Sequence, residues 1–311
     1  MNKFVQEAFV FESAATILFT FTSHFICQKH PSYMKKISIA LLFLIGFYTS
    51  LKSQETETQP VTKKKKGTFY IGWGYNKDWF SKSDLHFKNN SDEYNTYTNV
   101  VDDYNFTVYN AKAKDRPGFK KIFQSQLTIP QYVYRVGYYF NNKHHFGIEI
   151  NFDHAKYVVD DYQTLRVKGS IHGQYIDKDT LIDPNTFLHF EHTNGANFLM
   201  LNFMVRERLW GTKNEHHQIF AIAKPGAGIM IPKTEVVLFG QEQDNRFHVG
   251  GWCGGLEVGL RYEAFKHIYL EYTGKGAFLH YTDVLVIGQG KAQHHFWAFE
   301  NILVLGLQLG L

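Results

Sequence analysis

The sequence predicts an all-β fold in which a closed antiparallel sheet forms an up-and-down transmembrane barrel of eight strands, with ten strands as the alternative. Segments 247–262 and 267–282 alternate small or polar side chains with apolar ones, and only residues 263–266 join them. Such paired alternation is typical of a membrane-spanning β-hairpin. No stretch after residue 50 approaches the roughly 18 consecutive apolar residues that a spanning helix needs. Strands are therefore the predicted spanning elements.

Composition and charge exclude several classes of protein. The chain has 311 residues, of which 44% are hydrophobic and 17% aromatic, which excludes a disordered protein. Residues 1–53 hold five lysines and two glutamates, so the remainder keeps 4 − 3 = +1 of the net charge. No general basic field exists to attract nucleic acid. Cys27 lies in the same N-terminal part, so Cys253 alone can form neither an internal disulfide nor a cysteine metal cage.

The N-terminal part is predicted to be removed before folding. Met34, Lys35 and Lys36 precede an apolar run at 37–48 and a small-residue end at 51–53. This is the order of a secretory signal peptide, which we assign to 34–53. Residues 1–33 do not fit it and are expected to lie outside the true product, although 8–27 could instead be an apolar anchor. Residues 54–66, with a run of lysines at 63–66, are expected to form a periplasmic tether before a barrel at 67–311.

The strands follow from alternation and from the connections between them. In the last segment most of the odd positions, among them Trp297, Leu303 and Leu305, are apolar. Short turns at 141–143, 211–217 and 263–266 alternate with longer outer loops at 81–130, 160–196, 232–246 and 284–294, as in bacterial outer-membrane barrels. The eight predicted strands are 68–80, 131–140, 144–159, 197–210, 218–231, 247–262, 267–283 and 295–311.

Two features leave the strand count open. Segments 106–112 and 164–171 also alternate, so each could extend above the membrane or belong to an extra spanning hairpin, which gives the ten-strand alternative. Pro225 has no N–H to donate within the fifth predicted strand. We therefore expect a bulge there.

The face that should point inward carries charges of both signs. A soluble sandwich could not bury these side chains without a large desolvation penalty, whereas a membrane barrel can pair them around its axis while its apolar face meets lipid. With eight strands the side chains fill the lumen, so we expect a closed interior. The predicted lumen charges are Arg135, Glu149, Asp153, Arg206, Arg208, Lys224, Glu257, Arg261, Glu271, Lys275 and Glu300.

In these features the chain resembles the small eight-stranded outer-membrane barrels of Gram-negative bacteria, such as the OmpA transmembrane domain, OmpX and PagL. The resemblance covers 67–311 and rests on the signal peptide, the alternating segments, the short turns and the apolar final strand. The runs at 67–76 and 129–132 also look like a family of uncharacterised outer-membrane β-barrel proteins. The resemblance implies an outer-membrane location, contact with outer-membrane lipid and lipopolysaccharide, and no particular activity.

We expect a monomer with a structural or surface-recognition role, in which loops 81–130 and 160–196 contact any extracellular ligand. One alternative is a lipid A modifying acyl hydrolase of the PagL type, in which His280 would activate Thr282 on the same strand face. Another alternative is a small-solute channel. The chain has 16 histidines, and His154, His280 and His294 could gather near the outer rim, but their spacing does not define a metal site. We expect no cofactor and no metal.

The signal-peptide assignment gives a first testable prediction. We expect the exported protein to begin at Gln54, because cleavage is expected after Ser53 at the small-residue end. Intact-mass measurement and N-terminal sequencing of the protein from the cell envelope check this. A product that retains Met34 or any earlier residue would contradict it.

Overall fold

The computed structural model describes residues 67–96, 99–119, 130–140 and 145–310. The chain divides into two units, Met1–Lys63 and Lys64–Leu311, and all described residues belong to the second. The expectations for 1–33, 34–53 and 54–66, and the turn expected at 141–143, lie outside the described residues. No helix in the described ranges has the length and apolar character needed to cross a bilayer.

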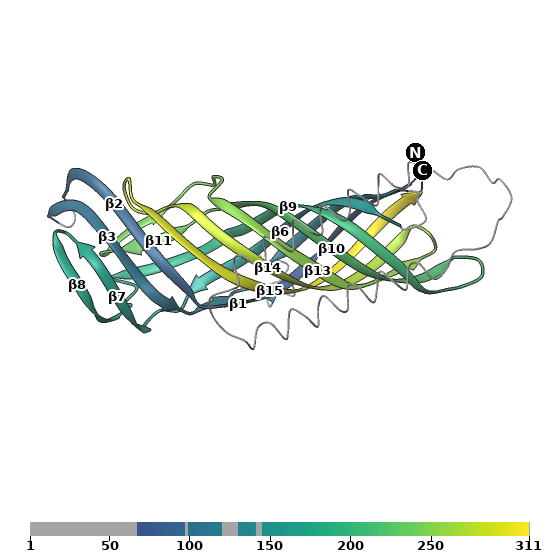
Figure 1. Ribbon diagram of the computed structural model, residues 1–311, viewed down its shortest axis with the longest axis horizontal. Coiled ribbons are helices and arrows are strands. Elements are labelled where there is room, and N and C mark those ends of the chain that lie inside the picture. Colours follow the sequence, from purple (N-terminus) through teal and green to yellow (C-terminus); the bar gives the residue numbers. More distant parts are fainter. Residues whose placement is uncertain (1–66, 97–98, 120–129, 141–144, 311) are drawn as a thin grey trace, which may run out of the picture. The chain divides into compact units, whose positions relative to one another are not determined.

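The described residues form one antiparallel sheet, which confirms the all-β prediction (Figure 1). Its strands are β1 (Thr68–Phe80), β2 (Ser83–Asn95), β3 (Val100–Ala111), β4 (Ala113–Asp115), β5 (Tyr132–Tyr139), β6 (Gly147–Val159), β7 (Thr164–Ile171), β8 (Gln174–Leu181), β9 (Leu188–Gly211), β10 (His217–Pro232), β11 (Glu235–Leu238), β12 (Gln241–Asp244), β13 (Gly251–Ala264), β14 (Ile268–Leu285) and β15 (Lys291–Gly310).

Eight of these strands are connected in a ring of pairings, and we call them the ring strands. Hydrogen-bonded neighbours run β1, β5, β6, β9, β10, β13, β14 and β15, and β15 pairs in turn with β1. The β1–β15 pairing covers all 13 residues of β1, from Thr68 opposite Gly310 to Phe80 opposite Ala298. The ring strands overlap the eight predicted strands closely. The bulge expected at Pro225 lies elsewhere, because the β9–β10 register shifts between Ile219 and Phe220.

The segments expected to be outer loops form further strands, which we call the extension: β2, β3, β4, β7, β8, β11 and β12. In Figure 1, β2, β3, β7 and β8 lie together at one end of the described unit. β2 continues the sheet from the end of β15, and β3, β7 and β8 follow in order. The alternating segments at 106–112 and 164–171 fall in β3 and β7, which pair with each other and not with the ring. They therefore add no strand to the ring.

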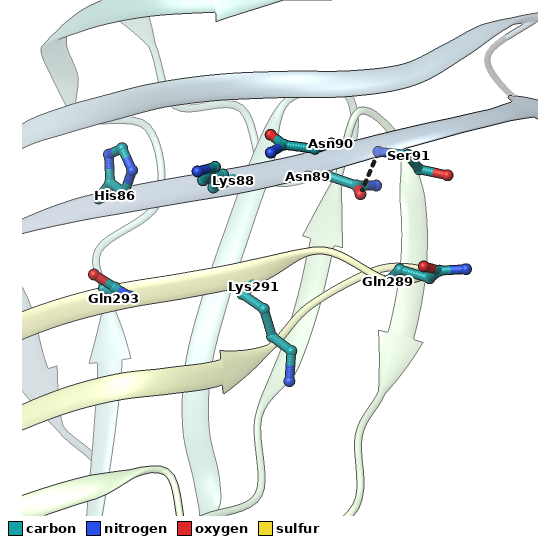
Figure 2. Close-up of a pocket in the computed structure, with 8 residues that line it drawn as sticks. All are labelled: His86, Lys88, Asn89, Asn90, Ser91, Gln289, Lys291 and Gln293. Atoms are coloured by element: carbon teal, nitrogen blue, oxygen red, sulfur yellow. Dashed lines mark hydrogen bonds between the residues drawn. The ribbon is translucent and has the colours of Figure 1, made fainter.

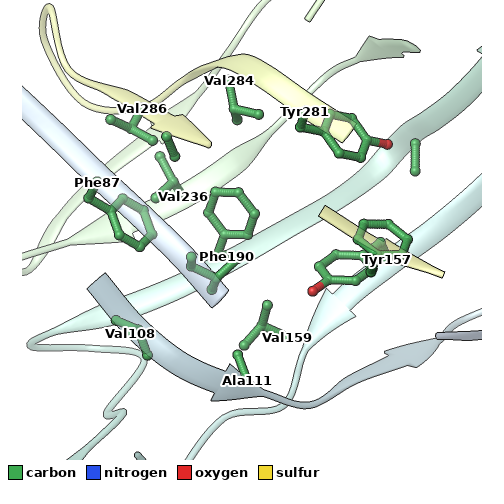
Figure 3. Close-up of a cluster of buried hydrophobic side chains, with 14 of the residues drawn as sticks. Phe87, Val108, Ala111, Tyr157, Val159, Phe190, Val236, Tyr281, Val284 and Val286 are labelled. Carbon is green, nitrogen blue, oxygen red and sulfur yellow. The ribbon is translucent and has the colours of Figure 1, made fainter. Parts of the chain in front are cut away.

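The side chains follow two opposite patterns along the molecule. On the ring strands, large apolar side chains are exposed, as for Leu303 (48%) and Leu305 (60%), while Glu257 and Arg261 are fully buried. In the extension most of the buried side chains are aromatic and aliphatic. Figure 3 shows part of this cluster, in which Phe87 from β2 and Phe190 from β9 pack edge to face with ring centroids 5.7 Å apart. The ring interior is therefore polar and the interior at the extension is apolar.

The seam between β1 and β15 can be tested by cross-linking. Ile71 lies directly opposite Leu307 in the register, and such pairs have Cα separations of about 4.5–5.5 Å, within the range of a disulfide. We expect Ile71→Cys with Leu307→Cys to cross-link on mild oxidation in a Cys27→Ser, Cys253→Ser background, which non-reducing electrophoresis detects. The control pair, Ile71→Cys with Leu303→Cys, is offset by four residues and should not cross-link. Equal cross-linking of both pairs would contradict the register.

Candidate functional site

The ring interior contains a network of charged side chains, most of them buried, that are joined by ion pairs and, at β1, by amide hydrogen bonds, and every ring strand contributes to it. Alternate side chains of a strand point to one face, so one charged residue or more from each strand reaches the interior. Arg135 comes from β5, Glu149 and Asp153 from β6, Arg206 from β9 and Lys224 from β10. The remaining members are Glu257, Arg261 and Glu263 of β13, Glu271 and Lys275 of β14, Glu300 of β15 and Asp78 of β1.

Glu257 is the centre of the network. Three cations approach its carboxylate: Arg135 Nη2 at 3.3 Å, Lys224 Nζ at 3.4 Å and Lys275 Nζ at 3.7 Å. Thr273 Oγ1 also donates a hydrogen bond to it at 2.9 Å. Each cation has further carboxylate partners, so the network continues in several directions. A carboxylate held this way keeps its charge although it is fully buried.

Beyond the centre, each cation bridges two or more strands. Lys224 contacts Glu149 at 3.0 Å and also pairs with Glu271. Arg135 and Lys275 both pair with Asp153. Because each of these cations pairs with several carboxylates, removal of one cation would leave several buried carboxylates with fewer partners.

At the end of the ring away from the extension, the network continues into aromatic side chains. Arg261 binds Glu263 at 2.9 Å and Glu271 at 3.3 Å, and its guanidinium lies 3.5 Å from the ring centroid of Tyr269. Arg206 binds Glu263 at 2.7 Å and lies 3.9 Å from the ring of Tyr139. Cation–π contacts of this kind are stronger where water is excluded.

At the end nearer the extension, carboxyl groups predominate. Asp78 and Glu300 lie opposite each other in the β1–β15 register, and both are buried. Asn76 Nδ2 donates to Asp78 at 3.3 Å and to Glu300 at 3.1 Å. The cation that reaches this end of the network is Lys275, with Nζ 3.8 Å from Glu300. Amide donors are therefore the closest partners of these carboxyl groups.

Most of the predicted lumen charges lie in this network, with two differences. Arg206 is partly exposed, and Arg208 is exposed, so Arg208 does not belong to it. The register shift between Ile219 and Phe220 places Leu209 in a bulge beside Arg208, close to the end of β9, where Leu209 and Trp210 are also exposed. The sequence reasoning missed Glu263 and Asp78. Glu263 has the same strand parity as Glu257 and Arg261 and could have been found, but it was assigned to a turn.

A buried histidine pair separates the ionic interior from the extension. His192 Nε2 and His294 Nε2 are 3.1 Å apart, and Thr234 Oγ1 lies 2.9 Å from His192 Nδ1. Ser83 Oγ donates to the carbonyl of His295 at 3.0 Å and lies 3.4 Å from His294 Nδ1. Burial lowers the pKa of His192 to about 3, and burial followed by His192 lowers that of His294 well below its usual value. Both rings are therefore neutral at pH 7.

The hydrogen bonds fix the tautomers of this pair. Because Ser83 donates its single proton to a carbonyl, His294 must donate from Nδ1 to Ser83 and accept at Nε2. His192 then donates from Nε2 and accepts from Thr234 at Nδ1. All four ring nitrogens are engaged, so this pair offers no lone pair to a metal ion.

A second polar cluster joins the extension to the end of β9. Glu191 accepts hydrogen bonds from Arg116 at 2.7 Å and Thr193 at 2.6 Å, and His189 bridges it to Asp161. The hydrogen bond to Glu191 raises the pKa of His189 to about 9, against the effect of burial. Burial alone would raise the pKa of Glu191, but its hydrogen bonds with His189 and Thr193 lower it to about 2. The two are therefore a charged pair at pH 7.

The weak catalytic candidates lie outside the interior. His280 points outward beside Trp252 and His295, with ring centroids 5.5 and 5.8 Å away, and Thr282 is exposed. The described hydrogen bonds include none between the side chains of His280 and Thr282. His154 hydrogen-bonds Asn197 at 2.8 Å, so the three histidines considered for a metal have separate surroundings. Within the described ranges, no group of three His, Cys, Asp or Glu side chains is placed to hold a metal ion.

A polar pocket of about 550 Å³ lies on the outer surface between β2 and the β14–β15 connection (Figure 2). Figure 2 shows the lining side chains on β2 and on and before the neighbouring β15, with Lys291 extending away from β2. The lining residues are His86, Lys88, Asn89, Asn90, Ser91, Gln289, Lys291 and Gln293.

Comparisons with known proteins find similarity to small outer-membrane β-barrel proteins. Ail of Yersinia pestis, solved with the heparin analogue sucrose octasulfate, is 11% identical, covers 78% of this chain and 99% of its own, and has a TM-score of 0.29. OprG of Pseudomonas aeruginosa is 13% identical over 81% and 100%, with a TM-score of 0.32. The outer-membrane protease OmpT of Escherichia coli is 8% identical over 83% and 100%, with a TM-score of 0.27. Similarities this low transfer neither a fold nor a function to the chain.

No protein-family model matches the sequence, and no curated protein matches it either.

The network can be tested by removing one cation. We expect Lys224→Met to lower the free energy of unfolding by about 3–5 kcal/mol, because it leaves Glu149, Glu257 and Glu271 with too few partners. Denaturant unfolding of the detergent-solubilised protein measures this. The exposed control, Lys178→Met, should change it by less than about 0.5 kcal/mol. Adding Glu271→Gln to Lys224→Met should restore part of the lost stability. Equal stability of Lys224→Met and Lys178→Met would contradict the network.

Proposed function

We propose that this chain is an integral outer-membrane β-barrel protein, in which the eight ring strands close around the ion-pair network and cross the bilayer. The observation that carries the proposal is the reversed polarity of the ring. Trp73, Ile150, Leu256, Leu270 and Leu305 are each more than two-fifths exposed, while the charged side chains between them are buried. In water both arrangements would be unfavourable, whereas in lipid the outer face is solvated by hydrocarbon.

The two ends of the ring strands differ, and this difference supports one orientation of the protein across the membrane. Short turns follow β9 and β13, and the extension lies at the opposite end. In bacterial barrels the short turns face the periplasm and the longer segments face outward. The predicted signal peptide at 34–53 agrees with export. We therefore propose that the extension projects from the outer surface of the cell.

The function that this architecture supports is a structural or surface-recognition role without enzymatic activity. The network fills the ring interior with paired side chains, which favours a closed lumen over a solute channel. The strands of the extension share a buried apolar cluster with the ring strands, so the extension presents an ordered surface in place of long loops. Any ligand would then meet the strands of the extension.

The bilayer assignment is tested by placing a charge on the exposed face. We expect Leu305→Arg to lower the free energy of unfolding from vesicles by about 2–4 kcal/mol, because an arginine near the bilayer centre is costly. Gln293→Arg, on the same outward face of β15 but beyond the apolar positions, is the control and should cost less than about 0.5 kcal/mol. In a soluble protein both sites are exposed to water, so a neutral Leu305→Arg would overturn the proposal.

A further inference from the structure

We propose that the pocket centred on Lys88 binds the phosphorylated sugar headgroup of an outer-leaflet glycolipid. The inference rests on the proposed function, because it takes the extension to face outward from the membrane. The pocket lies on the outward side of β2 and β15.

The side chains around Lys88 form a surface rich in hydrogen-bond donors. Lys88 faces Lys291 directly in the β2–β15 pairing and Asn105 in the β2–β3 pairing, and His86 faces Gln293. Among the described residues, the pocket lining holds two lysines and no carboxylate. Amides, a hydroxyl and an imidazole supply the rest. This chemistry suits an anion that is surrounded by sugar hydroxyls.

Lys88 differs from the other cations on this surface. Lys291 pairs with Asp283 at 2.7 Å, and Arg166 and Lys168 both pair with Asp177, at 2.8 and 3.7 Å. Within the described part of the chain, Lys88 has no ion pair. Lys291 lies opposite Lys88 in the β2–β15 pairing but is held by Asp283, so an anion in this pocket would meet Lys88 as the cation that has no carboxylate partner among the described residues.

The position of the pocket favours a glycolipid over a simple phospholipid. The outward side chains of β15 run from Lys291 through Gln293 and His295 to Trp297 and the apolar positions below it. Six residues of strand span about 20 Å, which at the usual tilt places Lys291 about 15 Å above Trp297. A ligand with acyl chains against the apolar face and anionic sugars above it would contact both regions at once.

The test uses the exported protein in detergent and fluorescently labelled lipopolysaccharide with a phosphorylated core. We expect Lys88→Gln to weaken binding about tenfold, since a hydrogen bond to a charged group is lost. The control, Lys178→Gln, removes an exposed cation from β8 and should bind like the wild type. Chemically dephosphorylated lipopolysaccharide should bind the wild type as weakly as the intact form binds Lys88→Gln, with no further loss in the variant.

Two results would overturn the inference. One is Lys88→Gln binding the intact lipopolysaccharide as tightly as Lys178→Gln does. The other is displacement of the label by inorganic phosphate as effectively as by unlabelled lipopolysaccharide, which would indicate a site for small anions only. Flotation of the same preparations with vesicles tests the membrane proposal separately, because a wild type that fails to float contradicts that proposal whatever the binding result.

Discussion

Charged groups that are taken out of water must find partners of opposite sign, and this constraint organises the ring strands. Arg135, Lys224 and Lys275 converge on Glu257 from three different strands, so the network forms only when the strands have their correct neighbours and register. The same alternation that turns these side chains inward turns the apolar ones outward. The exposed apolar face is thus a direct consequence of the ionic interior, and lipid is the surrounding in which both are favourable.

Along a single strand, the inward face changes from charged to apolar side chains and the outward face changes from apolar to polar ones. On β15, Glu300 is buried and Phe299 and Leu303 are exposed, whereas nearer the extension Phe296 is buried and Gln293 is exposed. The exchange occurs near Trp297, and the buried His192–His294 pair lies at about the same level. One continuous strand therefore has two kinds of interior, and under the proposed membrane assignment the change from ion pairs to aromatic rings would fall where lipid gives way to water.

Strand periodicity made the ring predictable, and strand parity indicated most of the charges that the structure buries. Arg208 keeps the inward parity, since it lies opposite the buried Phe220, but it is exposed near the end of β9, and local sequence does not show how far along a strand the enclosed interior extends. The extension was expected to be loop because β2 alternates apolar side chains only at Leu85 and Phe87 before its polar end, and β11 and β12 have four residues each. The His192–His294 contact joins residues 102 apart, and without a model of the sheet no spacing rule connects them.

The strand β8 lies at the margin of the sheet, since among the described strands it pairs only with β7. Such a margin is able to recruit a strand from another molecule. Here Asp177 and Asp179 hold Arg166 of β7 in ion pairs, and Lys178 lies between the two aspartates. A second chain would have to strip water from these charges before it could add to the sheet. The charges on β8 therefore oppose polymerisation through this open β-edge.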